Sequence, residues 1–217
     1  MATQVSICNE ALTLLGQDAI DAADLAGDLN TRATALADVY TQAMEQLLRM
    51  HPWNFATAKA DLTNLNETDE DYLPEWGFGY YYELPSGCLK VLYCQDRGIV
   101  WRVETYTFNS TTAKYLTTDE SEISIAYIRT FTAGTDESLF DPLFVSAFSA
   151  LLAAKTAYRI TKDMAMNKEM WALFFEIMKD ARFADSTESH VQQVEATTWV
   201  DARSGGYGYK TVQEPPA

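Results

Sequence analysis

Carboxylates are the most plentiful side chains that could do chemistry in this 217-residue chain. It contains 31 Asp and Glu but only 16 Lys and Arg. Seven acids and no base lie between Lys59 and Lys90. Two carboxylates at a suitable separation suffice for glycoside hydrolysis, so a glycoside hydrolase is one hypothesis. A solvated acidic segment is the other, since so acidic a chain forms such clusters without a catalytic purpose. The residues concerned are Glu67, Asp69, Glu70, Asp71 and Glu75.

Other catalytic and metal-binding patterns are missing from the sequence. His51 precedes Pro52 at a predicted helix end, where a ring more often bonds last-turn carbonyls, and His190 lies in a predicted tail. Cys8, Cys88 and Cys94 form no C-x-x-C pair and are interpreted as free, buried thiols. Serine-hydrolase, phosphate-loop, zinc and EF-hand patterns do not occur. The sequence therefore predicts no cofactor, no metal and no enzymatic activity.

The net charge of −15 restricts the partners of the chain. No two basic residues are adjacent, and a grip on nucleic acid needs clustered Lys and Arg. No run of 18 apolar residues occurs, so no membrane span is expected, and residues 1–5 do not open a secretory signal. We therefore expect a protein whose partners are other proteins.

Four helices are predicted, two near each end of the chain. The first starts at a possible N-cap, Thr3, and stops at Gly16; the second runs over about 28–50 and ends before Pro52. Residues 17–28, with four Asp, are expected to form a loop or short turn. The third begins at Asp141-Pro142 and is apolar on nearly every side.

The fourth helix, from about Asp163, has more apolar surface than one packing partner requires. One face collects Met170, Trp171, Phe174, Ile177, Met178 and Ala181. Leu173 and Phe175 add apolar area beside this face, which favours a second, intermolecular partner. Trp171 and Phe175 are therefore candidate interface residues.

The middle and the end of the chain have different patterns. Period-two alternation over 55–130 predicts an antiparallel meander of four to six strands. Residues 186–217 are rich in Ser, Thr and Gly but contain three further candidate interface residues, Trp199, Tyr207 and Tyr209. We interpret this segment as an arm that orders on a partner, with plain disorder as the alternative.

These elements combine into an α+β fold with a discontinuous helical part. Helices from 1–54 and 131–185 are expected to form one four-helix bundle, because neither pair makes a stable core alone. The β region, 55–130, is inserted between them. Residues 186–217 form the extended or flexible C-terminal arm.

Five short motifs occur in an order that resembles one protein family. They are Ile7-Cys8-Asn9-Glu10-Ala11-Leu12 before Leu15-Gly16, His51-Pro52-Trp53-Asn54-Phe55-Ala56, Tyr82-Glu83-Leu84-Pro85 before Cys88-Leu89-Lys90-Val91, Ile123-Ser124-Ile125-Ala126-Tyr127-Ile128, and Phe140-Asp141-Pro142-Leu143-Phe144. Over about 5–185 the chain resembles the tail tubular protein A family of short-tailed bacteriophages. The segment after residue 186 has no counterpart among these motifs.

The resemblance implies a structural virion protein, a head-to-tail adaptor. Such proteins form a homo-oligomeric ring, usually of twelve copies, beneath the portal protein, and dock the tail nozzle protein. DNA would pass the channel as non-specific cargo, and an acidic wall would let it slide by repulsion. The location implied is the virion tail at the head–tail junction, after assembly in the host cytoplasm. Two further hypotheses are a tail-associated peptidoglycan (glycoside) hydrolase that uses the paired carboxylates, and a capsid completion protein of a long-tailed phage.

Overall fold

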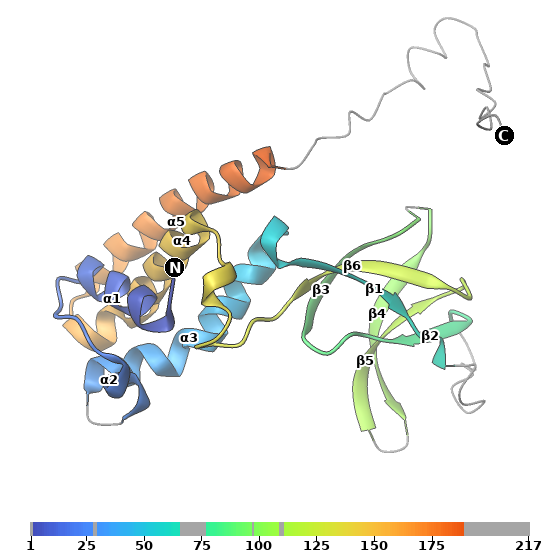
Figure 1. Ribbon diagram of the computed structural model, residues 1–217, viewed down its shortest axis with the longest axis horizontal. Coiled ribbons are helices and arrows are strands. Elements are labelled where there is room, and N and C mark those ends of the chain that lie inside the picture. Colours follow the sequence, from blue (N-terminus) through green and yellow to red (C-terminus); the bar gives the residue numbers. More distant parts are fainter. Residues whose placement is uncertain (1, 28–29, 66–76, 97, 109–110, 189–217) are drawn as a thin grey trace, which may run out of the picture.

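The computed structural model describes residues 2–27, 30–65, 77–96, 98–108 and 111–188, which form an α+β fold. Helices occupy one half of the molecule and strands the other (Figure 1). The chain passes from the helical half to the strands after α3 and returns to it before α4. The predicted α+β class is thus confirmed.

The helical half contains segments from both ends of the chain. Its helices are α1 (Gln4–Leu14), α2 (Ala22–Ala26), α3 (Thr31–Met50), α4 (Pro142–Thr161) and α5 (Met164–Thr187). Short 3₁₀ turns, η1 (Asn54–Ala56) and η4 (Glu137–Leu139), lie near the passages between the two halves. Helix α4 contacts α1, α3 and α5. The C-terminal helices therefore share one core with the N-terminal ones.

Local capping signals set the helix ends. Thr3 Oγ1 accepts from the Ser6 amide, and Gly16 has a φ of +64°, so the predicted start and stop of α1 are confirmed. Asp141 caps α4 and Pro142 is its first residue, again as predicted. The loop or turn expected over 17–28 is instead helical at Ala22–Ala26, because Asp21 and Asp24 cap one another's backbone amides.

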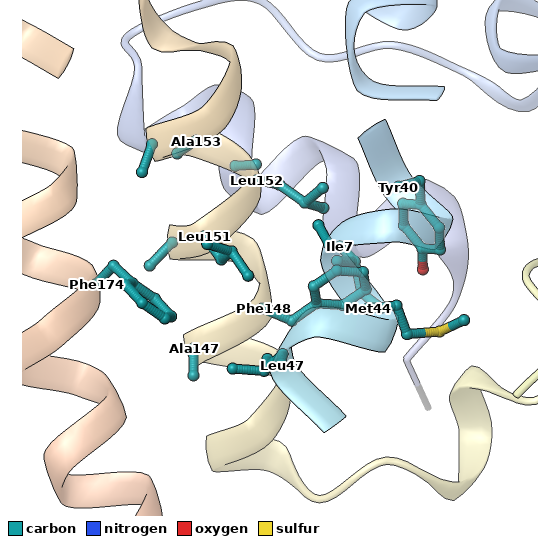
Figure 2. Packing of buried hydrophobic residues seen from close by; sticks show 14 of the residues in the cluster. Ile7, Tyr40, Met44, Leu47, Ala147, Phe148, Leu151, Leu152, Ala153 and Phe174 are labelled. Carbon is teal, nitrogen blue, oxygen red and sulfur yellow. The ribbon is translucent and has the colours of Figure 1, made fainter. Parts of the chain in front are cut away.

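The core of the helical half surrounds α4. Phe148, Leu151 and Leu152 are fully buried, and Phe148 meets the Tyr40 ring edge-on (Figure 2). By length and composition α4 could cross a membrane, contrary to the sequence expectation, but 61% of its apolar window is buried inside the fold. A buried core helix satisfies the same criterion.

Aromatic residues join the helical half to the strands. Trp53 is 1% exposed, its Nε1 donates to the Leu47 carbonyl at 3.1 Å, and its ring meets Phe144 at 5.1 Å. Phe55 contacts the rings of Phe140 and Phe144 at 5.9 and 4.9 Å. The two aromatics after Pro52 therefore anchor the junction, as their position past the helix end predicted.

The strands form two three-stranded antiparallel sheets. They are β1 (Thr57–Leu62), β2 (Tyr80–Glu83), β3 (Cys88–Cys94), β4 (Trp101–Phe108), β5 (Thr111–Thr118) and β6 (Ile123–Arg129). One sheet has the order β1-β6-β3 and the other β2-β5-β4. The predicted meander is therefore wrong, since only β4 and β5 are neighbours in both sequence and sheet. Period-two alternation tells which face of a strand is buried, but not which strand lies beside it.

A second, smaller core lies in the strand half. It draws buried residues from both sheets, so the sheets pack together through their side chains. Its members are Tyr82, Val91, Cys94, Leu116, Ile123 and Ile125.

Candidate protein-interaction surface

The outward side of α5 carries aromatic side chains that solvent reaches. Phe175 is 59% exposed and Phe183 is 73% exposed. Trp171 is partly buried, and its ring lies 6.1 Å from that of Phe175. We call Trp171, Phe175 and Phe183 the α5 aromatic face. Grouped exposed apolar side chains of this size mark interaction surfaces.

The opposite side of α5 explains why this face points outward. Met170, Phe174, Met178 and Ala181 are buried, and the helix packs along α4. Because consecutive residues are turned by about 100°, Phe175 is carried off the buried line on which Phe174 lies. Leu173 is only partly buried and packs against the core. Of the two apolar residues noted beside the predicted face, Phe175 alone is exposed.

Phe183 is a member of the face that sequence reasoning missed. It lies eight residues after Phe175, which places it about 12 Å further along the helix and roughly 80° around it. Phe183 lies about 180° around the helix from Phe174, so the apolar stripe that ends at Ala181 does not indicate it. The available signal is a large aromatic residue on the polar side of the predicted helix.

Positive side chains accompany the aromatic rings. Lys168 and Lys179 are exposed and lie on the same side of α5 as Phe175 by helical spacing. Two lysines beside exposed rings in a chain of net charge −15 favour an acidic partner surface. Glu176 and Asp180 are exposed on the adjoining side, so the positive character is confined to part of the helix.

The last turns of α5 are held by the segment that follows α3. His51 Nε2 lies 2.9 Å from Asp185 Oδ2, and the Asn54 amide donates to Asp185 Oδ1 at 3.0 Å. The Asn54 side-chain amide donates to the Asp185 carbonyl at 2.7 Å. Arg182 donates to the Met50 carbonyl at 2.8 Å. We call these four contacts the α5 clamp.

The α5 clamp has an architectural role that the sequence only suggested. His51 and Asn54 belong to the motif His51-Pro52-Trp53-Asn54-Phe55, which the resemblance treats as a landmark. His51 was expected to bond carbonyls at its own helix end, but its contact is instead a carboxylate of a helix that starts more than 100 residues later. The clamp joins α5 to the junction of the two halves, three residues before the described chain ends.

A buried carboxylate ties η4 to the N-terminal helices. Glu137 is 3% exposed and accepts from Tyr40 Oη at 3.1 Å and from the Gly134 amide at 2.6 Å. Burial, reinforced by the negative charge of Glu137, raises the pKa of Tyr40. Tyr40 belongs to the buried core of α3, and Gly134 lies in the turn before η4, so this network fastens the connection before α4 to the core.

The thiols are not activated for chemistry. Burial, with a smaller contribution from Glu137, raises the pKa of Cys8 to about 12. Burial likewise raises the pKa of Cys88 and of Cys94. All three cysteines are free. At neutral pH these side chains are protonated, and the thiol is a poor nucleophile and a poor metal ligand.

Several predicted site residues lie outside the residues that the structure describes. These are the carboxylates Glu67, Asp69, Glu70, Asp71 and Glu75 and the aromatics Trp199, Tyr207 and Tyr209. The candidate pair Trp171 and Phe175 is described, and α5 brings its members together. Within the described ranges, no group of three or more His, Cys, Asp or Glu could hold a metal ion.

Comparison with known proteins adds no relative. No family model matches the chain, and no curated protein sequence matches it.

Proposed function

We propose that this protein is a structural virion component, the ring-forming head-to-tail adaptor of a short-tailed bacteriophage. In this proposal it joins the portal protein to the tail nozzle protein and lets DNA pass through its channel. The observation that carries the proposal is the α5 aromatic face, on which Phe175 and Phe183 are exposed beside two lysines. The five ordered motifs of 5–185 supply the particular assembly.

The helical half supports an assembly role. A closed ring of identical subunits needs two different complementary surfaces on each subunit. The α5 aromatic face supplies an apolar surface, with Lys168 and Lys179 beside Phe175 and Asp180 about one turn before Phe183. Acidic side chains are exposed on the α1–α2 side of the molecule, where Glu10 and Asp21 lie together with Asp18, which pairs with Arg32 at 3.2 Å. Opposite charge on the two surfaces would favour head-to-tail contact between copies.

The two ends of the protomer would then have separate duties. In the proposal the discontinuous four-helix bundle forms the body of the ring, and the C-terminal arm predicted over 186–217 orders on the portal. The α5 clamp supports this division, since it holds the helix from which that segment continues. With twelve copies, the net charge of −15 per chain would repel DNA from the channel wall rather than bind it.

The proposal is tested by mixing the purified protein with portal rings of its phage and imaging the mixture by negative-stain electron microscopy. We expect ring-shaped density added to one end of the portal. Replacing both exposed aromatics, Phe175→Ser with Phe183→Ser, should abolish the added ring without unfolding the chain, because neither side chain is buried.

A matched control separates the α5 aromatic face from aromatic exposure in general. Tyr158 on α4 is 52% exposed and lies outside this face, so Tyr158→Ser should leave ring formation intact. Wild-type protein that stays monomeric beside portal would refute the adaptor role. Rings that form normally from the doubly substituted chain would instead remove the α5 aromatic face from the interface.

A further inference from the structure

Strand β4 lies at the edge of its sheet. It pairs with β5 over its full length, from Trp101 opposite Thr118 to Phe108 opposite Thr111. Among the residues that the structure describes, no strand lies along its other side. Strand β2 supports only the Tyr115–Thr118 end of β5, so the rest of the β4–β5 ribbon extends beyond the sheet (Figure 1). A free, eight-residue edge is a template for pairing with another chain.

The β4 edge also concentrates exposed apolar and charged side chains. Val100, just before the strand, is 69% exposed, Val103 is 41% exposed and Tyr106 is 44% exposed. Arg102 and Glu104 are exposed between them. Side chains alternate along a strand, so Val100, Arg102, Glu104 and Tyr106 share one face.

We propose that β4 pairs antiparallel with β4 of a second copy of this chain, about a two-fold axis at Val103. In this register Arg102 of each copy lies opposite Glu104 of the other. Val100 lies opposite Tyr106, and Val103 lies opposite itself. Opposite charges and apolar pairs in directly opposed positions stabilise antiparallel strands.

A second copy of the chain is the favoured partner, because the charge pattern of β4 is complementary to itself in an antiparallel pair. Charged residues on an edge strand usually prevent pairing, and two like charges would do so here. Arg102 and Glu104 are two positions apart and of opposite sign, so the antiparallel copy attracts both. The two-fold axis repeats the Arg102–Glu104 pair, so the dimer contains this attraction twice.

The other edge strands are less suited to the same contact. Strand β1 also carries opposite charges two apart, Lys59 and Asp61, but Asp61 Oδ1 already accepts from Ser124 Oγ within its own sheet at 2.5 Å. Its continuation at Asn64 bridges to Tyr82 of β2. Strand β3 has two register irregularities against β6. Bulges of this kind hinder regular edge pairing.

The proposed contact differs from the ring interface. A two-fold contact is closed after two copies, whereas a ring needs a head-to-tail contact. The β4–β4 dimer is therefore a state of the protein outside the ring, and it stands or falls independently of the adaptor proposal. Since the contact is small, it belongs to the weak class of interfaces.

Sedimentation equilibrium of the full chain, without portal and at up to about 1 mM, tests the dimer. Wild type should dimerise reversibly. Arg102→Glu and Glu104→Arg should each weaken self-association by about tenfold, because each places like charges opposite one another twice. Mixing the two single variants should restore the dimer as a heterodimer, since every opposed pair is then attractive.

Two further variants keep the result interpretable. The double variant Arg102→Glu with Glu104→Arg should dimerise like wild type, and Lys114→Glu, an exposed charge reversal on β5, should not weaken the dimer. Circular dichroism checks that each variant is folded, since Arg102 also lies 5.9 Å above the Phe78 ring. A strictly monomeric wild type, or a mixture no more associated than its two components, overturns the proposal.

Discussion

The α5 clamp predicts that Asp185 holds the end of α5 in place. Its carboxylate lies 2.9 Å from His51 Nε2 and accepts from the Asn54 amide at 3.0 Å. The side chain of Asp185 is 10% exposed and that of His51 is 18% exposed. Asp185→Ala removes both carboxylate contacts and leaves two polar groups without their partner. The Asn54 side chain can still donate to the Asp185 backbone carbonyl.

The size of the effect follows from burial. A hydrogen bond to a charged group contributes about 1.5–3 kcal/mol when the pair is shielded from water. Water can replace the partner of Asn54, whose residue is exposed, and only the last turns of α5 need to fray. We therefore expect Asp185→Ala to lower the free energy of unfolding by about 1–2 kcal/mol.

Two measurements check this expectation. Urea denaturation reports the loss of stability, and hydrogen exchange should show faster exchange of amides in 182–188, while α4 remains protected. Asp180→Ala is the matched control, because Asp180 is exposed on the same helix and its side chain makes no hydrogen bond to the described residues. Equal denaturation midpoints and unchanged exchange at the end of α5 would refute the clamp.

Three further predictions concern the buried core and the turns. The Cys8 thiol, with a pKa of about 12, should resist a thiol reagent at pH 8 until urea unfolds the chain. As pH rises from about 9 to 12, this thiol loses its proton in the unfolded chain before it does so in the folded chain. The free energy of unfolding should therefore fall over this pH range. Gly87→Ala should destabilise the protein by about 2 kcal/mol or more in thermal melts, because φ is +77° and the new Cβ would lie 2.6 Å from Thr130 Oγ1. Gly16→Ala should cost only about 1 kcal/mol, because φ is +64° but the new Cβ would meet no atom within 4 Å. Glu137→Ala should cost about 1–3 kcal/mol in urea denaturation, because it leaves the buried Tyr40 hydroxyl unpaired while water can reach the exposed Gly134 amide. Glu137→Gln should cost less because it keeps an acceptor oxygen.

The candidate site was only partly predictable. The surplus of apolar residues on the fourth helix pointed to Phe175, and the structure exposes that ring. Trp171 was expected beside it and is partly buried. Phe183 lies on the opposite side of the helix from Phe174, so the apolar stripe did not indicate it. The roles of Trp199, Tyr207 and Tyr209 remain predictions, because these residues lie outside the described ranges.

The clamp shows why some contacts could not be predicted. His51 and Asp185 are 134 residues apart, and each alone has an ordinary local explanation. His51 ends one helix and Asp185 lies in the last turns of another. Their contact arises only because α3 and α5 both pack against α4. No pattern of neighbouring residues in the sequence indicates that His51 and Asp185 come together.

The sequence by itself determined the elements of this protein, because helix caps and apolar periods act within a few residues. Asp141-Pro142 starts α4, and the apolar residues around that helix make it the centre of the core. The tertiary structure alone decided which strands are neighbours, and therefore that β4 lies at the edge of its sheet among the described strands. It also decided that Asp185 meets His51. Strand pairing and helix contact join residues far apart in the chain, and their choice depends on how whole elements fill the shared core.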